Sequence, residues 1–397
     1  MPMSLADNSA LLGGGADVLS RHPIFRARDL ELAREHLSGV LPPHRLTYLT
    51  SDRRLDFRHR RFAPRHLSRH RQNPGKTLAY GPLMSRKARD PKKTGREPTP
   101  PWKPTDLCPC GGDSLYGRCC LGFDGRAYKQ PVERAPPGPH TGFSHPDCYM
   151  GWTHDCDKTI SGEHYISASV LKQLGGPMLK LGGVPWIPPG DTKILPISSL
   201  TANILCKRHN EGFSKLDATA GRFFAGVKMV VGDILDKKTP SMRRKWLLFG
   251  GEDLEVWLLK TAIGLFHSGT VAKDSAKLCD KQTINPACYR VLYDGTPPAP
   301  FGVYVEPIQL AEQMNQLELW PLSDDAGQRM IGLRMSYLTF ALHLLFDPNA
   351  VYGPAATGGK TYRPSYLMVR NARRTHTIML TWPPTLANER GVVLVSF

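Results

Sequence analysis

Cys108-Pro-Cys110-Gly-Gly-Asp-Ser-Leu-Tyr-Gly-Arg-Cys119-Cys120 places four of the nine cysteines of the chain within thirteen residues. Thiolates are soft ligands, and four of them close a structural zinc site in tetrahedral geometry. The glycines between the cysteine pairs permit the sharp turns that such a loop needs. Two disulfides are the alternative, but Cys119 and Cys120 are adjacent and residues 1–18 do not resemble a signal peptide. We therefore expect a zinc centre at Cys108, Cys110, Cys119 and Cys120.

This run resembles the SEC-C motif, CPCGSGxxYxxCC/H, which is found at the tail of the preprotein translocase motor. Gly112-Asp113 stands where that family usually has Ser-Gly, and the four cysteines are retained. The resemblance covers about thirteen residues and implies a zinc-stabilised knob that docks onto another protein. We place this module at residues 105–125, between proline clusters at 98–104 and 131–139 that are typical of linkers.

Length and composition indicate a protein of two or three domains. The chain has 397 residues, of which 41% are hydrophobic, and no run is long and apolar enough to cross a bilayer. A reducing, cytoplasmic location fits the cysteine usage, because disulfides are rare there and cysteine clusters bind metal.

Positive charge is concentrated in one segment. The formal net charge is +17, and residues 52–97 hold fifteen Lys and Arg against four acidic residues, a net +11. Such a segment attracts phosphate backbones, which predicts a nucleic-acid partner. A solvated linker is the alternative, because few aromatic residues are available in it for base stacking.

The stretch from Val18 to Asp56, which contains RHPIFRARDLELAREHLSGVLPPHRL, resembles the opening of the ligand-binding domain of AraC-type transcription regulators. Within it, the apolar periodicity of residues 27–40 predicts an amphipathic helix. The resemblance implies a β-barrel, but residues 58–104 lack the alternation of strands. We interpret residues 1–60 as a fragment of such a domain and 61–104 as a basic, proline-containing linker.

A second set of ligand types follows at Cys148, Cys156, Cys206 and His209. Two cysteines and a CxxH pair complete a zinc shell, although the seven residues between Cys148 and Cys156 exceed the usual two to four. Ordinary buried thiols are the alternative.

The order of these residues resembles the HNH endonucleases, whose pattern is CxxC, DHIxP, NLxxLC, CxxCN; the match spans residues 148–217. The resemblance implies a ββα unit, within residues 140–270, that binds one catalytic divalent ion such as magnesium or manganese. Carried over by position, Glu163 stands for the metal-binding Asp, His164 for the general base and Asn210 for the Asn on the helix. Glu in place of Asp, and Tyr165 and Ser167 in place of Ile and Pro, depart from the family pattern.

These residue types suit phosphodiester hydrolysis, because that reaction needs a base and a cation that neutralises the charge on the phosphate. Adjacent Glu163 and His164 point to opposite faces of a strand unless a turn or bulge intervenes. Asn210 precedes an apolar-periodic run typical of a helix, and Asp217 falls on nearly the same helical face as a further candidate metal ligand. A structural Glu–His pair and a helix cap at Asn210 are the alternatives.

The rest of the sequence indicates segments with structural roles. The pattern from Glu252 to Phe266 is typical of a helix, and we expect Cys279 and Cys288 to be structural. Residues 289–397 predict a β-rich C-terminal domain; the run from Met335 to Phe346 fits either a buried strand or a helix. The expected strands are 290–293, 302–306, 317–322, 367–370, 376–382 and 392–397.

Together these patterns predict an α+β, multi-domain protein with small zinc-binding modules, an HNH-like (ββα-metal) core and a β-rich C-terminal domain. The expected activity is metal-dependent hydrolysis of nucleic acid with His164 as general base. A catalytically inactive zinc-stabilised module that binds nucleic acid or protein is the alternative, and a ligand-binding transcription regulator of the AraC type is the third.

Overall fold

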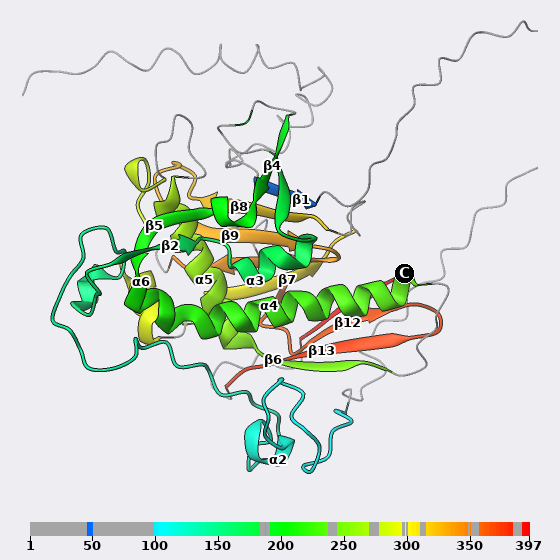
Figure 1. The fold of residues 1–397 in the computed structure, drawn as a ribbon. Coiled ribbons are helices and arrows are strands. Elements are labelled where there is room, and N and C mark those ends of the chain that lie inside the picture. The colour runs from blue at the N-terminus through cyan, green and yellow to red at the C-terminus, as the bar shows by residue number, and fades with distance from the viewer. Residues whose placement is uncertain are drawn as a thin grey trace, which may run out of the picture.

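The computed structural model describes residues 46–50, 99–182, 187, 191–236, 244–269, 278–295, 298, 301–309, 315–347, 350, 357–383 and 391–397. It combines helices with three sheets, which confirms the α+β class (Figure 1). The predicted helix over residues 27–40, the basic segment 52–97 and all of the AraC-like stretch except 46–50 lie outside the described residues.

The largest sheet has eight strands in the order β11-β7-β10-β9-β8-β1-β3-β4, and every neighbouring pair is antiparallel. The run from Met335 to Phe346 resolves into the end of β9 and the whole of β10, which form a hairpin around Leu338. The strands are β1 (Leu46–Thr50), β3 (Met178–Gly182), β4 (Thr192–Pro196), β7 (Gly302–Pro307), β8 (Leu317–Ser323), β9 (Met330–Tyr337), β10 (Phe340–Leu345) and β11 (Thr361–Tyr362).

A second sheet has four strands in the order β14 (Val392–Ser396), β12 (Tyr366–Arg370), β13 (Thr375–Thr381) and β6 (Trp246–Gly250). The central pair is antiparallel and both outer pairs are parallel. The strands expected in the C-terminal region, except at 290–293, are therefore present, but they share both sheets with earlier segments of the chain.

The third sheet is a hairpin-like pair, β2 (Ile160–His164) and β5 (Thr201–Cys206), which are antiparallel. Helix α4 (Lys207–Leu235) begins directly after β5. Residues 165–200, which include β3 and β4, are inserted between the two strands of this ββα arrangement.

The other helices are α2 (Tyr116–Cys119), α3 (Ala168–Leu171), α5 (Gly251–Ser268) and α6 (Ala287–Asp294), with 3-10 turns η3 (Gly151–Thr153), η4 (Lys172–Leu174), η5 (Ile197–Ser199) and η7 (Leu278–Asp280). The expected strand at residues 290–293 is wrong, because these residues belong to α6. Cys288 and Leu292 lie one helical turn apart and are both buried, which is helical spacing. Within the described residues, no helix is both long enough and apolar enough to cross a membrane.

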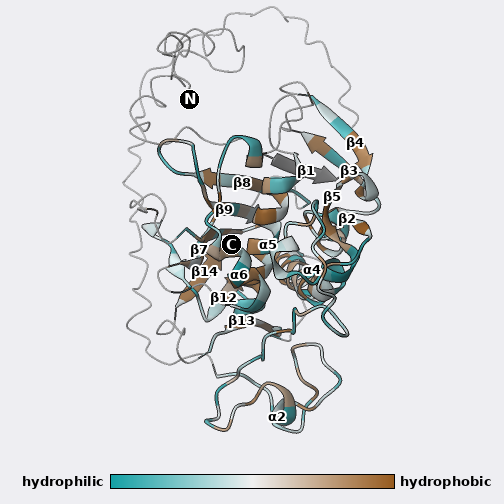
Figure 2. Ribbon diagram, turned by 90° about the vertical axis from the view of Figure 1, so that its left-hand side faces the viewer, coloured by the Kyte–Doolittle hydropathy of each residue, from teal (hydrophilic) through white to brown (hydrophobic). Residues whose placement is uncertain are grey.

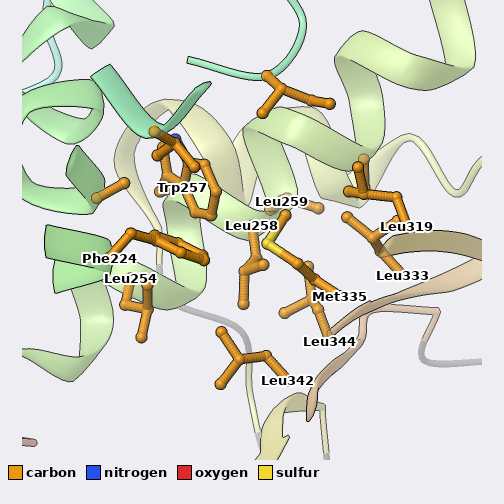
Figure 3. Packing of buried hydrophobic residues seen from close by; sticks show 14 of the residues in the cluster. Phe224, Leu254, Trp257, Leu258, Leu259, Leu319, Leu333, Met335, Leu342 and Leu344 are labelled. Atoms are coloured by element: carbon orange, nitrogen blue, oxygen red, sulfur yellow. The ribbon is translucent and has the colours of Figure 1, made fainter. Parts of the chain in front are cut away.

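Helix α5 forms the centre of the core. Every residue from 251 to 266 is buried, and the helix contacts strands of both larger sheets as well as α4 and α6. Figure 2 shows hydrophobic residues on the strands around it, and Figure 3 shows Trp257 and Leu258 packed beside Phe224 of α4 and Met335 of β9. A helix that is buried on all sides lies inside the protein, so the predicted helix over Glu252 to Phe266 is present and forms part of the scaffold.

The polar residues of α5 are buried with partners from distant segments. The Tyr128 hydroxyl donates to Glu252 at 2.9 Å, and the Arg363 guanidinium donates to the Glu255 carboxylate at 2.9 Å. Lys260 extends toward α4 and β2. Because a buried charge without a partner is costly, these contacts fix how the surrounding segments pack on the helix.

Candidate functional site

The first candidate metal centre joins the ββα arrangement to the loop before it. Cys148 and Cys156 flank η3, Cys206 ends β5, and His209 lies in the first turn of α4; all four side chains are buried. His209 Nδ1 lies 3.1 Å from Cys206 Sγ and 3.7 Å from the sulfurs of Cys148 and Cys156. The four ligand atoms all lie within 4.8 Å of one another. We call this group the cysteine–histidine centre.

This donor set fits zinc. With Zn–S bonds of about 2.3 Å and tetrahedral angles, ligand atoms lie about 3.5–4 Å apart. A hydrogen bond from Cys148 lowers the pKa of the Cys206 thiol, and the deprotonated thiolate is the form that binds metal. Thr153 Oγ1 contacts the other ring nitrogen of His209 at 3.0 Å, which orients the imidazole as outer-shell partners of zinc ligands do.

The long spacing between Cys148 and Cys156 is accommodated by a compact turn. Gly151 N donates to Cys148 O at 2.7 Å, and His154 adopts a left-handed conformation with φ 55° that turns the chain back. Asp155 then accepts two hydrogen bonds from Arg208 of α4, at 2.9 and 3.1 Å. This ion pair holds the turn against the helix that carries His209.

The second candidate centre is the Cys108–Cys120 run, which we call the four-cysteine centre. Cys110 Sγ lies 3.6 Å from Cys119 Sγ, which lies 3.7 Å from Cys120 Sγ, and the four sulfurs share one site. Gly111 has φ 81°, and a Cβ on Gly112 would touch the sulfurs of Cys110 and Cys119 at 3.7 and 3.9 Å. The positive φ of Gly111 thus permits the turn that wraps the four thiols, whereas a side chain at Gly112 would make only ordinary contacts. A bound zinc would cross-link the loop.

The module around the four-cysteine centre packs on the rest of the protein. Its Tyr116 and Cys120 belong to a small core with Leu248 of β6, and Arg222 of α4 donates to Cys110 O at 2.9 Å. Three large apolar side chains of the module, Leu107, Leu115 and Phe123, remain exposed at 71%, 37% and 116%. One face of the module is therefore covered by β6 and α4 of the same chain. Docking of another protein onto the module stays a prediction.

The predicted metal-binding carboxylate, Glu163, is paired inside the protein. Its carboxylate contacts the ammonium of Lys260 from α5, and that ammonium also lies 2.9 Å from both oxygens of Asp217 on α4. Ser167 Oγ donates to Asp217 and accepts a hydrogen bond from Trp257 Nε1 at 2.6 Å. The structure thus brings Glu163 and Asp217 together, with a lysine between them.

His164 and Asn210 lie outside this ion cluster. The backbone irregularity in β2 falls between Ser161 and Glu163, one step before the Glu163–His164 pair. His164 is half-buried, burial lowers its pKa, and its Nε2 has no hydrogen-bond partner among the described residues. Asn210 Nδ2 donates to Ser161 Oγ at 3.1 Å, and the N-cap of α4 is Cys206, so Asn210 does not cap the helix.

Sequence reasoning missed Lys260. The signal was present, because it is the only Lys or Arg in the apolar run from Leu254 to Phe266. A buried lysine requires a carboxylate partner, but the sequence alone does not say which carboxylates α5 meets.

A groove lies beside the cysteine–histidine centre. Its volume is about 400 Å³. It brings Lys158 and the first residues of α4 next to Phe143, which is 36% exposed. The lining residues are Pro137, Thr141, Phe143, Cys156, Asp157, Lys158, Lys207, Arg208 and Glu211.

Comparison of the chain with protein-family models, curated proteins and solved structures found no match. The fold and its ligand groups therefore define the class: a mixed helix-and-sheet protein with two centres, one of four cysteines and one of three cysteines and a histidine, that suit a metal ion such as zinc.

Proposed function

We propose that this protein is a zinc-stabilised nucleic-acid-binding protein built on an HNH-like ββα core. The observation that carries the proposal is the arrangement of β2, β5 and α4, in which the cysteine–histidine centre fixes the start of α4 beside a groove that contains Lys158 and Lys207. In this proposal the zinc ions cross-link the chain, and the protein's own residues contact the nucleic acid.

The groove has the chemistry to hold a phosphate backbone. Lys158 and Lys207 supply positive charge, and the groove lies at the N-terminal end of α4, where the helix dipole favours anions. The lining also holds two carboxylates, Asp157 and Glu211, and Asp157 accepts a hydrogen bond from Thr159 N at 2.8 Å. The net charge of +17 adds long-range attraction for a polyanion, and Phe143 offers an aromatic surface for a base.

Salt-dependent binding tests this proposal. Fluorescence anisotropy of a short labelled DNA duplex and of a single-stranded RNA would be measured over a range of salt for the wild type, for Lys158→Ala/Lys207→Ala and for Lys103→Ala/Lys193→Ala. The control pair removes two exposed lysines away from the groove. We expect the groove variant to lower the slope of log K against log salt by about 2 and the control to leave it unchanged.

The proposal fails if the zinc-loaded wild type binds neither polymer. If it binds and the groove variant keeps the wild-type slope, the groove is not the phosphate site. The two substrates together show whether DNA or RNA is preferred.

A second candidate function, nuclease activity, is favoured by His164. An imidazole with a lowered pKa is neutral near pH 7, and Nε2, which is buried, has no hydrogen-bond partner among the described residues. Cleavage of plasmid and single-stranded substrates with magnesium or manganese, compared with His164→Ala of equal zinc content, tests it. Cutting that disappears in the variant supports a nuclease, and inactivity of both proteins removes this second candidate.

A further inference from the structure

We infer that the ammonium of Lys260 takes the place that a catalytic divalent ion would occupy between Glu163 and Asp217. This inference rests on the HNH-like core proposed above. In that core Glu163 and Asp217 are the carboxylates expected to hold magnesium or manganese. The residues around these two carboxylates do not fit such an ion.

The contacts of the ammonium show why. Nζ lies 2.9 Å from Oδ1 and 2.9 Å from Oδ2 of Asp217, and it also contacts Oε1 of Glu163. An ammonium has three donors, and these three oxygens account for all of them. A divalent ion bound to the same oxygens would meet a like charge within the shell, and like charges in a buried site repel strongly.

Lys260 is held in place by its helix. Its side chain is 4% exposed, as is that of Glu163, and the neighbouring residues of α5 are buried on every side. Attraction to Asp217 and Glu163 outweighs burial and raises the pKa of Lys260, so it stays charged near neutral pH. The positive charge between the two carboxylates is therefore a fixed part of the protein, unlike a metal ion that can dissociate.

The predicted helix asparagine, Asn210, does not join the ion cluster. Asn210 donates to Ser161, and Asp217 is oriented by Ser167, which in turn is fixed by Trp257. The cluster thus links β2, α4 and α5 as an internal clamp. If His164 acts as a base, it does so without a divalent ion on Glu163.

Manganese binding tests the inference in the full-length, zinc-loaded protein. Mn²⁺ titrations followed by electron paramagnetic resonance and by thermal unfolding would compare the wild type, Glu163→Gln, Lys260→Ala and Lys260→Ala/Glu163→Gln. We expect no difference in Mn²⁺ binding between the wild type and Glu163→Gln. Lys260→Ala should bind Mn²⁺ roughly tenfold or more tighter, because repulsion by the ammonium is removed, and the double variant should lose this gain.

Two results would overturn the inference. One is a Mn²⁺ site in the wild type that Glu163→Gln abolishes, a comparison that needs no lysine variant to fold. The other is a folded Lys260→Ala that binds no more Mn²⁺ than the wild type. Neither result depends on the anisotropy experiment, so nucleic-acid binding can fail or stand separately.

Discussion

Replacing Lys260 with methionine should destabilise the protein by about 3 kcal/mol. The substitution keeps the length and most of the volume of the side chain but leaves Glu163 and Asp217 facing each other without a cation. Removing one partner of a buried ion pair costs about 3–5 kcal/mol. The Asp217 side chain is 23% exposed and retains some hydration, so the lower end of that range applies.

Urea unfolding followed by tryptophan fluorescence measures the effect, at saturating zinc and near neutral pH. Lys228→Met is the matched control, because Lys228 lies on α4 and its ammonium donates to the neutral carbonyl of Gln173 at 2.6 Å. We expect the control to cost about 1 kcal/mol or less. Adding Glu163→Gln and Asp217→Asn to Lys260→Met should restore most of the stability, since no buried charge is then unpaired.

A free energy of unfolding for Lys260→Met within about 1 kcal/mol of the wild type would refute this reasoning. So would a triple variant less stable than Lys260→Met. Either outcome would mean that the two carboxylates do not depend on the ammonium.

Three further predictions concern the metal centres, pH and packing. Elemental analysis should find two zinc ions per chain and one in each of Cys156→Ser and Cys119→Ser; unchanged zinc content in either variant would contradict the assigned ligands. Burial lowers the pKa of His343 to about 4, whereas an unfolded histidine titrates near 6.5. The unfolded state therefore binds more protons between these two pH values. The contribution of His343 to the free energy of unfolding is fully present above pH 6.5 and falls by up to about 3 kcal/mol on acidification to pH 4. In denaturation curves, His343→Gln should remove this part of the pH dependence. In thermal unfolding, Gly232→Ala should stabilise α4 by about 0.5–1 kcal/mol, because nothing lies within 4 Å of the new Cβ. Gly251→Ala should destabilise the protein, because its Cβ would lie 2.5 Å from a tryptophan ring. Equal effects of the two substitutions would refute this reasoning.

Local patterns predicted more of this structure than distant contacts could. The four-cysteine centre is set by thirteen residues of sequence, and the apolar run of α5 predicts a buried helix. The pairing of Lys260 with Glu163 joins residues almost one hundred positions apart and depends on how α5 packs against β2, which no local pattern encodes.

The error in α6 has a different origin. The short window 290–293 predicts a strand when it is taken alone, although Cys288 and Leu292 already have helical spacing. Asn285 Oδ1 accepts a hydrogen bond from Ala287 N at 3.0 Å, which stabilises the start of the helix. The helical signal therefore appears only when Asn285 and Cys288, which precede the window, are considered together with Leu292.

The position of α5 in the chain has a consequence for biosynthesis. Three strands that cover this helix, β9, β10 and β13, all follow it, and β13 ends 113 residues after α5 ends. At about 5–20 residues per second the ribosome needs roughly 6–20 s to complete that stretch. Until each strand has been synthesised, the part of the apolar surface of α5 that it covers has no partner, and the part facing β13 waits longest. The yield of folded protein should therefore depend on translation speed through residues 269–381 and on chaperones that shield the nascent helix.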